Sequence, residues 1–268
     1  MRRYIYFRQN VLILFLIIFV QSVFASSVPG SESGNDSIEG VLEVGELYRQ
    51  FTYDVIESKP MFEAVIFSSG LIEGAKATCL VVVLVGGRGG AETIGLGRMV
   101  DRFVEKGACL VVQPLAFVWS ESQKIVWPTY FVSPPEALVP TEDWITYLVK
   151  SILGSEVDIH GEVYLVGFSS SGPAVYSLLS SGRFVSGAVV AGSVFDSSRV
   201  FNGLPLKGRR LFVYHSPFDS IVDIKNAYAA REYFRSVGVS VFLREHIYGH
   251  SGVDNYSALV EGMSWLKR

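Results

Sequence analysis

The chain has 268 residues, a formal net charge of −3, and 49% hydrophobic and 18% charged residues. This length suits one large domain with a sizeable buried core. The acidic balance and the absence of a basic stripe argue against nucleic acid or a strongly anionic surface as a partner. No CxxC pair and no metal-ligand spacing occurs, so a metal site is not expected.

The first 25 residues have the three parts of a secretory signal. Three arginines in the first eight residues precede an unbroken apolar run from Val11 to Val20, and Val23-Phe24-Ala25 fits a cleavage site. The run is shorter than the roughly 20 apolar residues that a membrane span needs. We therefore expect an exported protein, periplasmic or secreted, with no stable membrane insertion after cleavage. The alternative is an uncleaved N-terminal anchor over Tyr4 to Phe24.

The domain is expected to begin well after this signal. Loss of residues 1–25 removes three arginines and no acidic residue, which lowers the net charge by three, from −3 to −6. Residues 26–40 are rich in Ser and Gly and predict a flexible leader. We expect residues 41–268 to form a single α/β domain. No internal repeat is present, and the oligomeric state is unknown at this point.

The pattern of apolar residues changes along this domain. Short alternating runs between Val41 and Gly70 predict an antiparallel pair of strands. From residue 78 onward, continuous apolar runs alternate with helical spacing. Strands are predicted at 79–85, 108–113, 163–166, 185–191, 211–214 and 239–243, and helices at 96–106, 144–153, 174–179, 224–237 and 256–267. This alternation predicts a mostly parallel sheet with helices on both faces.

The two cysteines lie near the starts of two predicted strands. Cys79 and Cys109 can pair in an oxidising compartment. Neighbouring parallel strands rarely offer the geometry of a disulfide, so two buried thiols are an equal alternative.

The segment from Leu115 to Pro140 departs from the strand and helix pattern. It contains four prolines and five aromatic residues, namely Phe117, Trp119, Trp127, Tyr130 and Phe131. A long loop within a compact domain is often functional, so we interpret it as a lid or a pocket wall. The alternative is ordinary surface packing.

The stretch from Val163 to Gly172 predicts a nucleophile elbow. A strand runs into a tight turn and then a helix, with Gly167 two residues before Ser169 and Ser171 two residues after it. This approximates the pattern G-x-S-x-G, with Ser171 in place of the second Gly. In the frame of Ser170 the bulky Phe168 would fall at −2, and in the frame of Ser171 a proline falls at +2. Ser169 is therefore the predicted nucleophile.

An acid and a base follow in the order that this kind of site requires. Asp219 lies shortly after the strand 211–214, where its carboxylate can orient an imidazole, and His250 lies in a glycine-flanked loop after the last strand. We predict Asp219 as the acid and His250 as the base that takes the proton of Ser169. The rival acids are Asp196, Asp223 and Asp254, and the other histidines are His160, His215 and His246.

The glycine-rich run Gly86 to Gly90 follows the first buried strand and predicts an oxyanion loop. The backbone N–H groups of Arg88 and Ser170 are the expected donors to a developing oxyanion. A dinucleotide site is a poor alternative, because Glu92 occupies the third glycine position when the motif is counted from Gly87.

Together these motifs resemble the α/β-hydrolase superfamily, from about Tyr53 to the C-terminus. The likeness is to dienelactone-hydrolase-like proteins, the phospholipase/carboxylesterase group and polyester-depolymerase-type esterases. It rests on four stretches: Gly86-Gly87, the elbow at Ser169, His215-Ser-Pro-Phe-Asp219-Ser-Ile-Val222, and Gly249-His250. Gly86-Gly87 stands where these families have His-Gly, and Ser171 where they have Gly.

The resemblance implies a serine esterase that acts on a small-molecule or acyl ester without a metal or cofactor. The sequence equally permits a peptidase or thioesterase with the same Ser169, Asp219 and His250. A third hypothesis is a non-catalytic exported binding protein that keeps the fold, since a fold does not prove a function.

Overall fold

The computed structural model describes residues 46–52, 61–67, 77–90, 97, 100, 109–153, 159–250 and 256–268. All of them belong to one compact unit, Ile38–Arg268. The signal at 1–25 and the leader at 26–40 lie outside the described residues. So does most of the helix expected at 96–106, of which Gly97 and Val100 are described and are helical.

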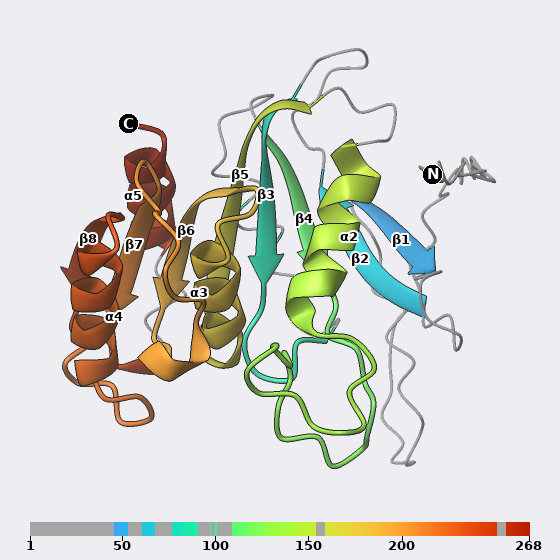
Figure 1. Ribbon diagram of the computed structural model, residues 1–268, viewed down its shortest axis with the longest axis horizontal. Helices are drawn as coiled ribbons and strands as arrows, with labels where there is room; N and C mark the ends of the chain where they lie inside the picture. The colour runs from blue at the N-terminus through green and yellow to red at the C-terminus, as the bar shows by residue number, and fades with distance from the viewer. Residues whose placement is uncertain are drawn as a thin grey trace, which may run out of the picture. The chain divides into compact units, whose positions relative to one another are not determined.

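Eight strands form one sheet in the order β1-β2-β4-β3-β5-β6-β7-β8 (Figure 1). Neighbours from β4 through β3 to β8 are parallel, whereas β2 is antiparallel to both β1 and β4. The mostly parallel sheet and the opening antiparallel pair are therefore confirmed. The strands are β1 (Glu46–Thr52), β2 (Met61–Phe67), β3 (Ala77–Leu84), β4 (Cys109–Pro114), β5 (Ile159–Phe168), β6 (Val185–Ala191), β7 (Arg210–His215) and β8 (Ser240–Glu245).

Continuous apolar runs form the central strands because both faces of the sheet are covered there. In β3 every residue from Leu80 to Leu84 is fully buried. At the edge, β8 is more exposed, and Phe242 is 38% exposed. The central strands thus give a rigid support to the loops that leave their ends.

Helices cover both faces of this sheet. They are α2 (Thr141–Leu153), α3 (Gly172–Ser180), α4 (Lys225–Ser236) and α5 (Tyr256–Leu266). A side-chain carbon on Gly172 of α3 would meet Val190, and one on Gly262 of α5 would meet Val189. Successive residues of a strand point to opposite faces, so α3 and α5 lie on opposite sides of the sheet. None of the helices in the described ranges is long and apolar enough to cross a bilayer.

The strand order reverses direction at β3. The chain passes from β3 to β4 on one side and then returns to place β5 on the other side of β3. Ligands of open α/β sheets bind at such a switch point, outside the carboxyl ends of the strands. The loops that follow β3 and β5 both begin there, and they carry Gly86 and Ser169.

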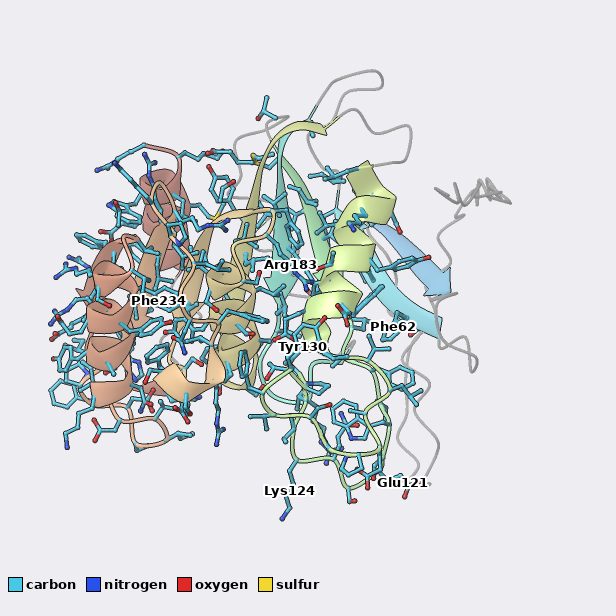
Figure 2. All side chains as sticks on the ribbon, viewed as in Figure 1. Phe62, Glu121, Lys124, Tyr130, Arg183 and Phe234 are labelled. Carbon is cyan, nitrogen blue, oxygen red and sulfur yellow. A yellow bond between two sulfur atoms is a disulfide. The ribbon has the colours of Figure 1, made fainter. Side chains whose placement is uncertain are left out.

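The segment 115–140 contains turns but no helix or strand. Its first half lies against the loop after β3, where the buried Trp127 donates its indole N–H to the carbonyl of Val85 at 2.9 Å. Its second half contacts α2, and Tyr130 lies near Arg183 with the guanidinium 5.8 Å from the ring centre (Figure 2). Both halves of the segment thus contact neighbouring elements, and its interpretation as a lid or a pocket wall stays a prediction.

Cys79 and Cys109 form a disulfide between β3 and β4. The two residues are direct partners in the parallel register, and their Cα atoms are 4.4 Å apart. Of the two alternatives left open by the sequence, the structure therefore has the bridge. Register decides this outcome, because a shift of one residue would turn one of the two side chains to the opposite face.

The disulfide is expected to stabilise the fold. It closes a loop of 30 residues, which in the chain-entropy model corresponds to about 3–4 kcal/mol. A reducing agent should therefore lower the midpoint of urea unfolding of the protein. A Cys79→Ala/Cys109→Ala double variant is the control and should have a low midpoint that the reductant leaves unchanged. Equal midpoints for oxidised and reduced wild type would contradict the expectation.

Candidate active site

Ser169 lies in a sharp turn directly after β5. Phe168 ends the strand in an extended conformation, and Ser169 begins a 3₁₀ turn, η2 (Ser169–Ser171), that leads into α3. Ser169 has a φ of 51°, and it is the one non-glycine residue in the described ranges with a positive φ. Strain of this kind is concentrated at functional sites. The strand, turn and helix predicted for the elbow are all present.

The turn is so tight that its neighbours must lack side chains. A side-chain carbon on Gly86 would come within 2.8 Å of the carbonyl oxygen of Phe168, and one on Gly172 would collide with Ser193 at 1.8 Å. At Gly167 it would lie 2.6 Å from Val175 of α3. These three glycines therefore allow the elbow to pack closely against the loop after β3, the loop after β6 and α3.

Ser171 replaces the second glycine of the motif without opening the turn. Its side chain is buried, and its hydroxyl donates to the carbonyl of Leu84 at 2.6 Å. The same oxygen accepts the N–H of Phe168 at 2.8 Å. The hydroxyl thus joins the elbow to the end of β3, a role that glycine cannot have.

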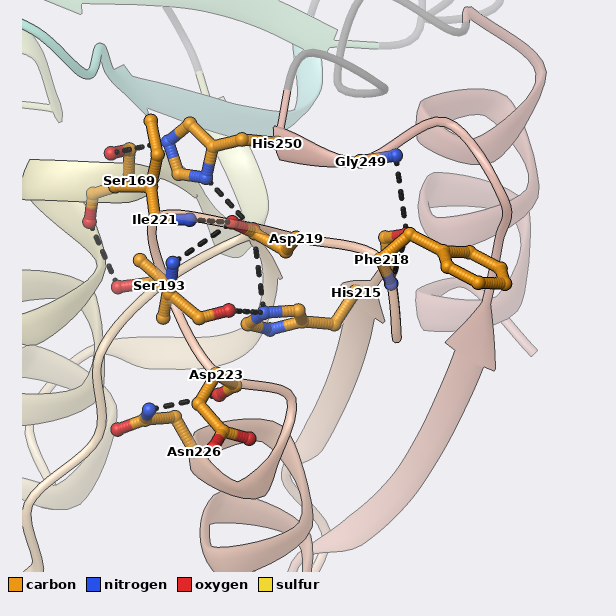
Figure 3. A network of polar contacts seen from close by, with 12 residues as sticks. Ser169, Ser193, His215, Phe218, Asp219, Ile221, Asp223, Asn226, Gly249 and His250 are labelled. Atoms are coloured by element: carbon orange, nitrogen blue, oxygen red, sulfur yellow. Dashed lines mark hydrogen bonds and ion pairs between the residues drawn. The ribbon is translucent and has the colours of Figure 1, made fainter.

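A chain of hydrogen bonds connects Ser169, His250 and Asp219 (Figure 3). Nε2 of His250 lies 3.0 Å from Oγ of Ser169, and Nδ1 lies 2.8 Å from Oδ2 of Asp219. An ionised carboxylate only accepts hydrogen bonds, so Nδ1 carries the imidazole proton. Nε2 is then free to accept the hydroxyl proton of Ser169. The structure thus brings together the three residues that the sequence predicted as nucleophile, acid and base.

Asp219 is held as a carboxylate by its surroundings. Its side chain is only 1% exposed, and Oδ1 accepts the backbone N–H groups of Ile221 and Val222, each at 2.8 Å. Burial alone raises the pKa of this carboxyl, but the hydrogen bonds from Val222, His250 and Ile221 outweigh it. The pKa of Asp219 is therefore below its ordinary value.

Two further features of this site were not identified from the sequence as parts of it. His215 is buried at the end of β7 and has Nε2 2.8 Å from the carbonyl of Val222 and 3.5 Å from Oδ2 of Asp219. Gly192 has a φ of 51°, and a side-chain carbon there would lie 3.5 Å from both His250 and Asp219. The position of each residue at the end of a parallel strand was the available signal, because these ends share one edge.

The rival acids in the described ranges are occupied elsewhere. Asp196 caps a short 3₁₀ turn through the N–H of Ser198 at 2.9 Å and pairs with Arg199 at 3.0 Å. Asp223 accepts the N–H of Lys225 at the start of α4. Asp254 lies outside the described residues. None of the contacts of Asp196 or Asp223 involves His250.

The rival histidine His246 is also engaged away from the serine. Its ring stacks on Tyr214, with the ring centres 3.9 Å apart, and burial lowers its pKa. His160 lies near the start of β5, at the opposite end of the strand from Ser169. The other two serines differ as well: Ser170 donates to the carbonyl of Gly87 at 3.0 Å, and Ser171 is buried against β3.

The glycine-rich loop after β3 lies against the elbow. Its backbone forms a turn closed by a hydrogen bond of 3.1 Å from the N–H of Gly89 to the carbonyl of Gly86. Gly87 and Arg88 are the central residues of this turn, so their N–H groups stay outside its own hydrogen bond. The assignment of Arg88 and Ser170 as oxyanion donors remains a prediction. In the described part of the chain, no group of three or more His, Cys, Asp or Glu side chains is placed to hold a metal.

Comparison with known proteins adds structural relatives only. No family model matches the sequence, and no curated protein is similar enough in sequence to match. A thermostable esterase superposes with a TM-score of 0.64 and 18% identity over 83% of this chain, which spans 62% of the length of that esterase. An S-formylglutathione hydrolase from Agrobacterium tumefaciens superposes with a TM-score of 0.61 and 13% identity. The match covers 84% of this chain and 96% of the hydrolase.

A carboxylesterase from Lactobacillus plantarum is similar as well, with a TM-score of 0.58 and 14% identity over 82% of this chain and 97% of its own. At these identities the comparisons establish the architecture. The strand order, the strained serine after β5 and these structural relatives agree. The chain has the α/β-hydrolase fold, as the sequence motifs predicted.

The depressed pKa of Asp219 predicts a pH-dependent contribution to stability. A carboxyl whose pKa is lower in the folded state stabilises the fold above its unfolded pKa, which is about 3.9, and this contribution is lost as the pH falls through the folded value. The difference in unfolding free energy between wild type and Asp219→Asn should therefore shrink as the pH falls below about 4.

Urea unfolding of both proteins between pH 3 and pH 7 measures this difference. Glu121→Gln, which changes an exposed carboxylate at the tip of segment 115–140 (Figure 2), is the control and should follow wild type throughout. A difference between wild type and Asp219→Asn that does not vary with pH would show that the carboxylate is not stabilised in this way.

Proposed function

We propose that this protein is an exported serine hydrolase that cleaves a carboxylic ester through an acyl-enzyme at Ser169. The observation that carries the proposal is the hydrogen-bonded chain from Ser169 through His250 to Asp219, with the serine strained at the switch point of the sheet. In this arrangement a neutral imidazole accepts the proton of the attacking hydroxyl.

The proposed reaction has two halves. Oγ of Ser169 attacks the ester carbonyl while Nε2 of His250 takes its proton, and Asp219 stabilises the resulting imidazolium. The backbone N–H groups of Arg88 and Ser170 would bind the oxyanion of the tetrahedral intermediate. His250 then gives the proton to the departing alcohol, which leaves an acyl group on Ser169. In the second half a water molecule attacks this ester by the same route, and it releases the acid and regenerates the serine.

Export is supported by two independent features. The first 25 residues have the charge, apolar run and small residues of a secretory signal. The disulfide between Cys79 and Cys109 suits an oxidising compartment outside the cytoplasm.

A thioester is a second candidate substrate. One structural relative is an S-formylglutathione hydrolase, whose named substrate carries its formyl group on sulfur. Ser169, with His250 as its base, would attack either carbonyl. The substrates assayed must therefore include esters and thioesters, together with a peptide anilide that tests for peptidase activity.

The proposal predicts which side chains hydrolysis requires. On 4-nitrophenyl acetate and butyrate, Ser169→Ala should reduce kcat to background, and His250→Ala should reduce it by about 10²–10⁴-fold, because the general base is lost. Steady-state kinetics of each variant, with folding checked by circular dichroism, is the measurement. His246→Ala changes the rival histidine and should keep kcat within a few fold.

Three outcomes would contradict this account. Wild-type activity in Ser169→Ala would show that Ser169 is not the nucleophile. A loss of activity in His246→Ala equal to that in His250→Ala would contradict the assignment of His250 as the base. No turnover of any ester, thioester or anilide by folded wild type would favour a non-catalytic binding protein.

A further inference from the structure

The loop after β3 is held between two parts of the protein. On one side Gly86 contacts the elbow, since a side-chain carbon there would lie 3.3 Å from Cβ of Ser169. The hydroxyl of Ser170 also donates to the carbonyl of Gly87 at 3.0 Å. These contacts hold the part of the turn that faces the serine. They do not involve the other end of the loop, at Gly89.

The first half of segment 115–140 supports that other end. The N–H of Ala116 donates to the carbonyl of Gly89 at 2.8 Å. A side-chain carbon on Gly89 would lie 2.5 Å from Cβ of Ala116, 2.8 Å from Val126 and 3.3 Å from the ring of Trp127. Gly89 has a φ of 71°, a conformation that favours glycine, and these three side chains leave no room for a side chain on it.

Trp127 contacts the loop at both of its ends. Its ring packs at Gly89, and its indole N–H donates to the carbonyl of Val85, the residue at which the loop begins. The side chain is only 4% exposed. A buried carbonyl that loses its donor is costly, so this hydrogen bond defines where the chain leaves β3. Only three residues lie between Val85 and Gly89, and Arg88 is one of them.

We infer that Trp127 is a positioning residue for the oxyanion loop and that Ala116, Val126 and Trp127 together form its fixed rear wall. This inference rests on the proposed function, because it assigns Trp127 to the placement of the N–H of Arg88. An oxyanion donor acts only when it is aligned with the charge that develops in the transition state. A shift of the turn therefore weakens transition-state binding while the ground-state complex is nearly unchanged.

The test uses Trp127→Phe, which keeps an aromatic ring and removes the N–H. We expect kcat per active site to fall about 5- to 50-fold with KM within twofold of wild type, a smaller loss than the about 10²–10³-fold that follows removal of a donor. A trifluoromethyl ketone, which forms a tetrahedral oxyanion on the serine, should lose affinity by the same factor as kcat/KM. Active sites are counted by the end point of fluorophosphonate labelling, so a smaller folded fraction does not imitate the effect.

Two variants complete the experiment. Trp119→Phe changes a tryptophan of the same segment for which the described residues show no indole hydrogen bond, and it should behave as wild type. Val126→Ala loosens the packing on Gly89 and leaves the hydrogen bond of Trp127 intact. Val126→Ala should also lower kcat, but by a smaller factor than Trp127→Phe. This result tests the inference even if Trp127→Phe does not fold.

The outcomes separate the two claims. If wild type turns over no substrate, both the proposed function and the inference are overturned. If wild type is active but Trp127→Phe and Val126→Ala keep its kcat and ketone affinity, only the inference is overturned. A rise in KM with unchanged kcat would also overturn it, because the segment would then bind substrate and not position the oxyanion loop.

Discussion

The left-handed backbone at Ser169 is the constraint on which the site depends. A serine with a φ of 51° at the end of β5 is strained, and the surrounding structure must hold it there. It is held by a close contact with Gly86, by the N–H of Gly172, which donates to the carbonyl of Ser169, and by the hydroxyl of Ser171, which joins the turn to Leu84 of β3. The same contacts bring the loop after β3 and the N-terminus of α3 to the serine, so one tight turn organises three elements.

The site also requires that Asp219 be ionised, although its side chain is buried. A carboxylate without partners would be protonated there, because burial disfavours its charge. Two backbone N–H groups and His250 keep it ionised, and His215 lies beside it at the end of β7. Since the acid is fixed by backbone atoms of its own loop, His250 is oriented by a rigid partner and presents Nε2 to Ser169.

Much of this arrangement could be predicted from the sequence because it depends on local patterns. Continuous apolar runs identify strands buried on both faces, and a strand, a tight turn and a helix around Ser169 require small residues at fixed positions. Asp219 and His250 follow parallel strands, whose carboxyl ends share one edge of the sheet. The chain order of these residues was therefore sufficient to predict that the three side chains meet.

The remaining features depend on contacts between distant parts of the chain. The pairing of Cys79 with Cys109 required the register of β3 and β4, which two separate apolar runs do not specify. In the sequence, Ser171 is only a departure from the motif. The structure shows that its hydroxyl bonds to the carbonyl of Leu84, which is distant in the chain. Likewise, the composition of segment 115–140 indicated aromatic packing, but only the position of Trp127 against Val85 and Gly89 shows which loop it supports.

Covalent labelling determines whether Ser169 is an activated nucleophile. The purified protein is treated with a fluorophosphonate probe, and the modified peptide is identified by mass spectrometry in wild type, Ser169→Ala and His250→Ala. We expect a single adduct on Ser169 of wild type and none in either variant, because the attacking oxygen needs its base. An adduct on Ser170 or Ser171, or no adduct on a protein that is fully folded, would contradict it.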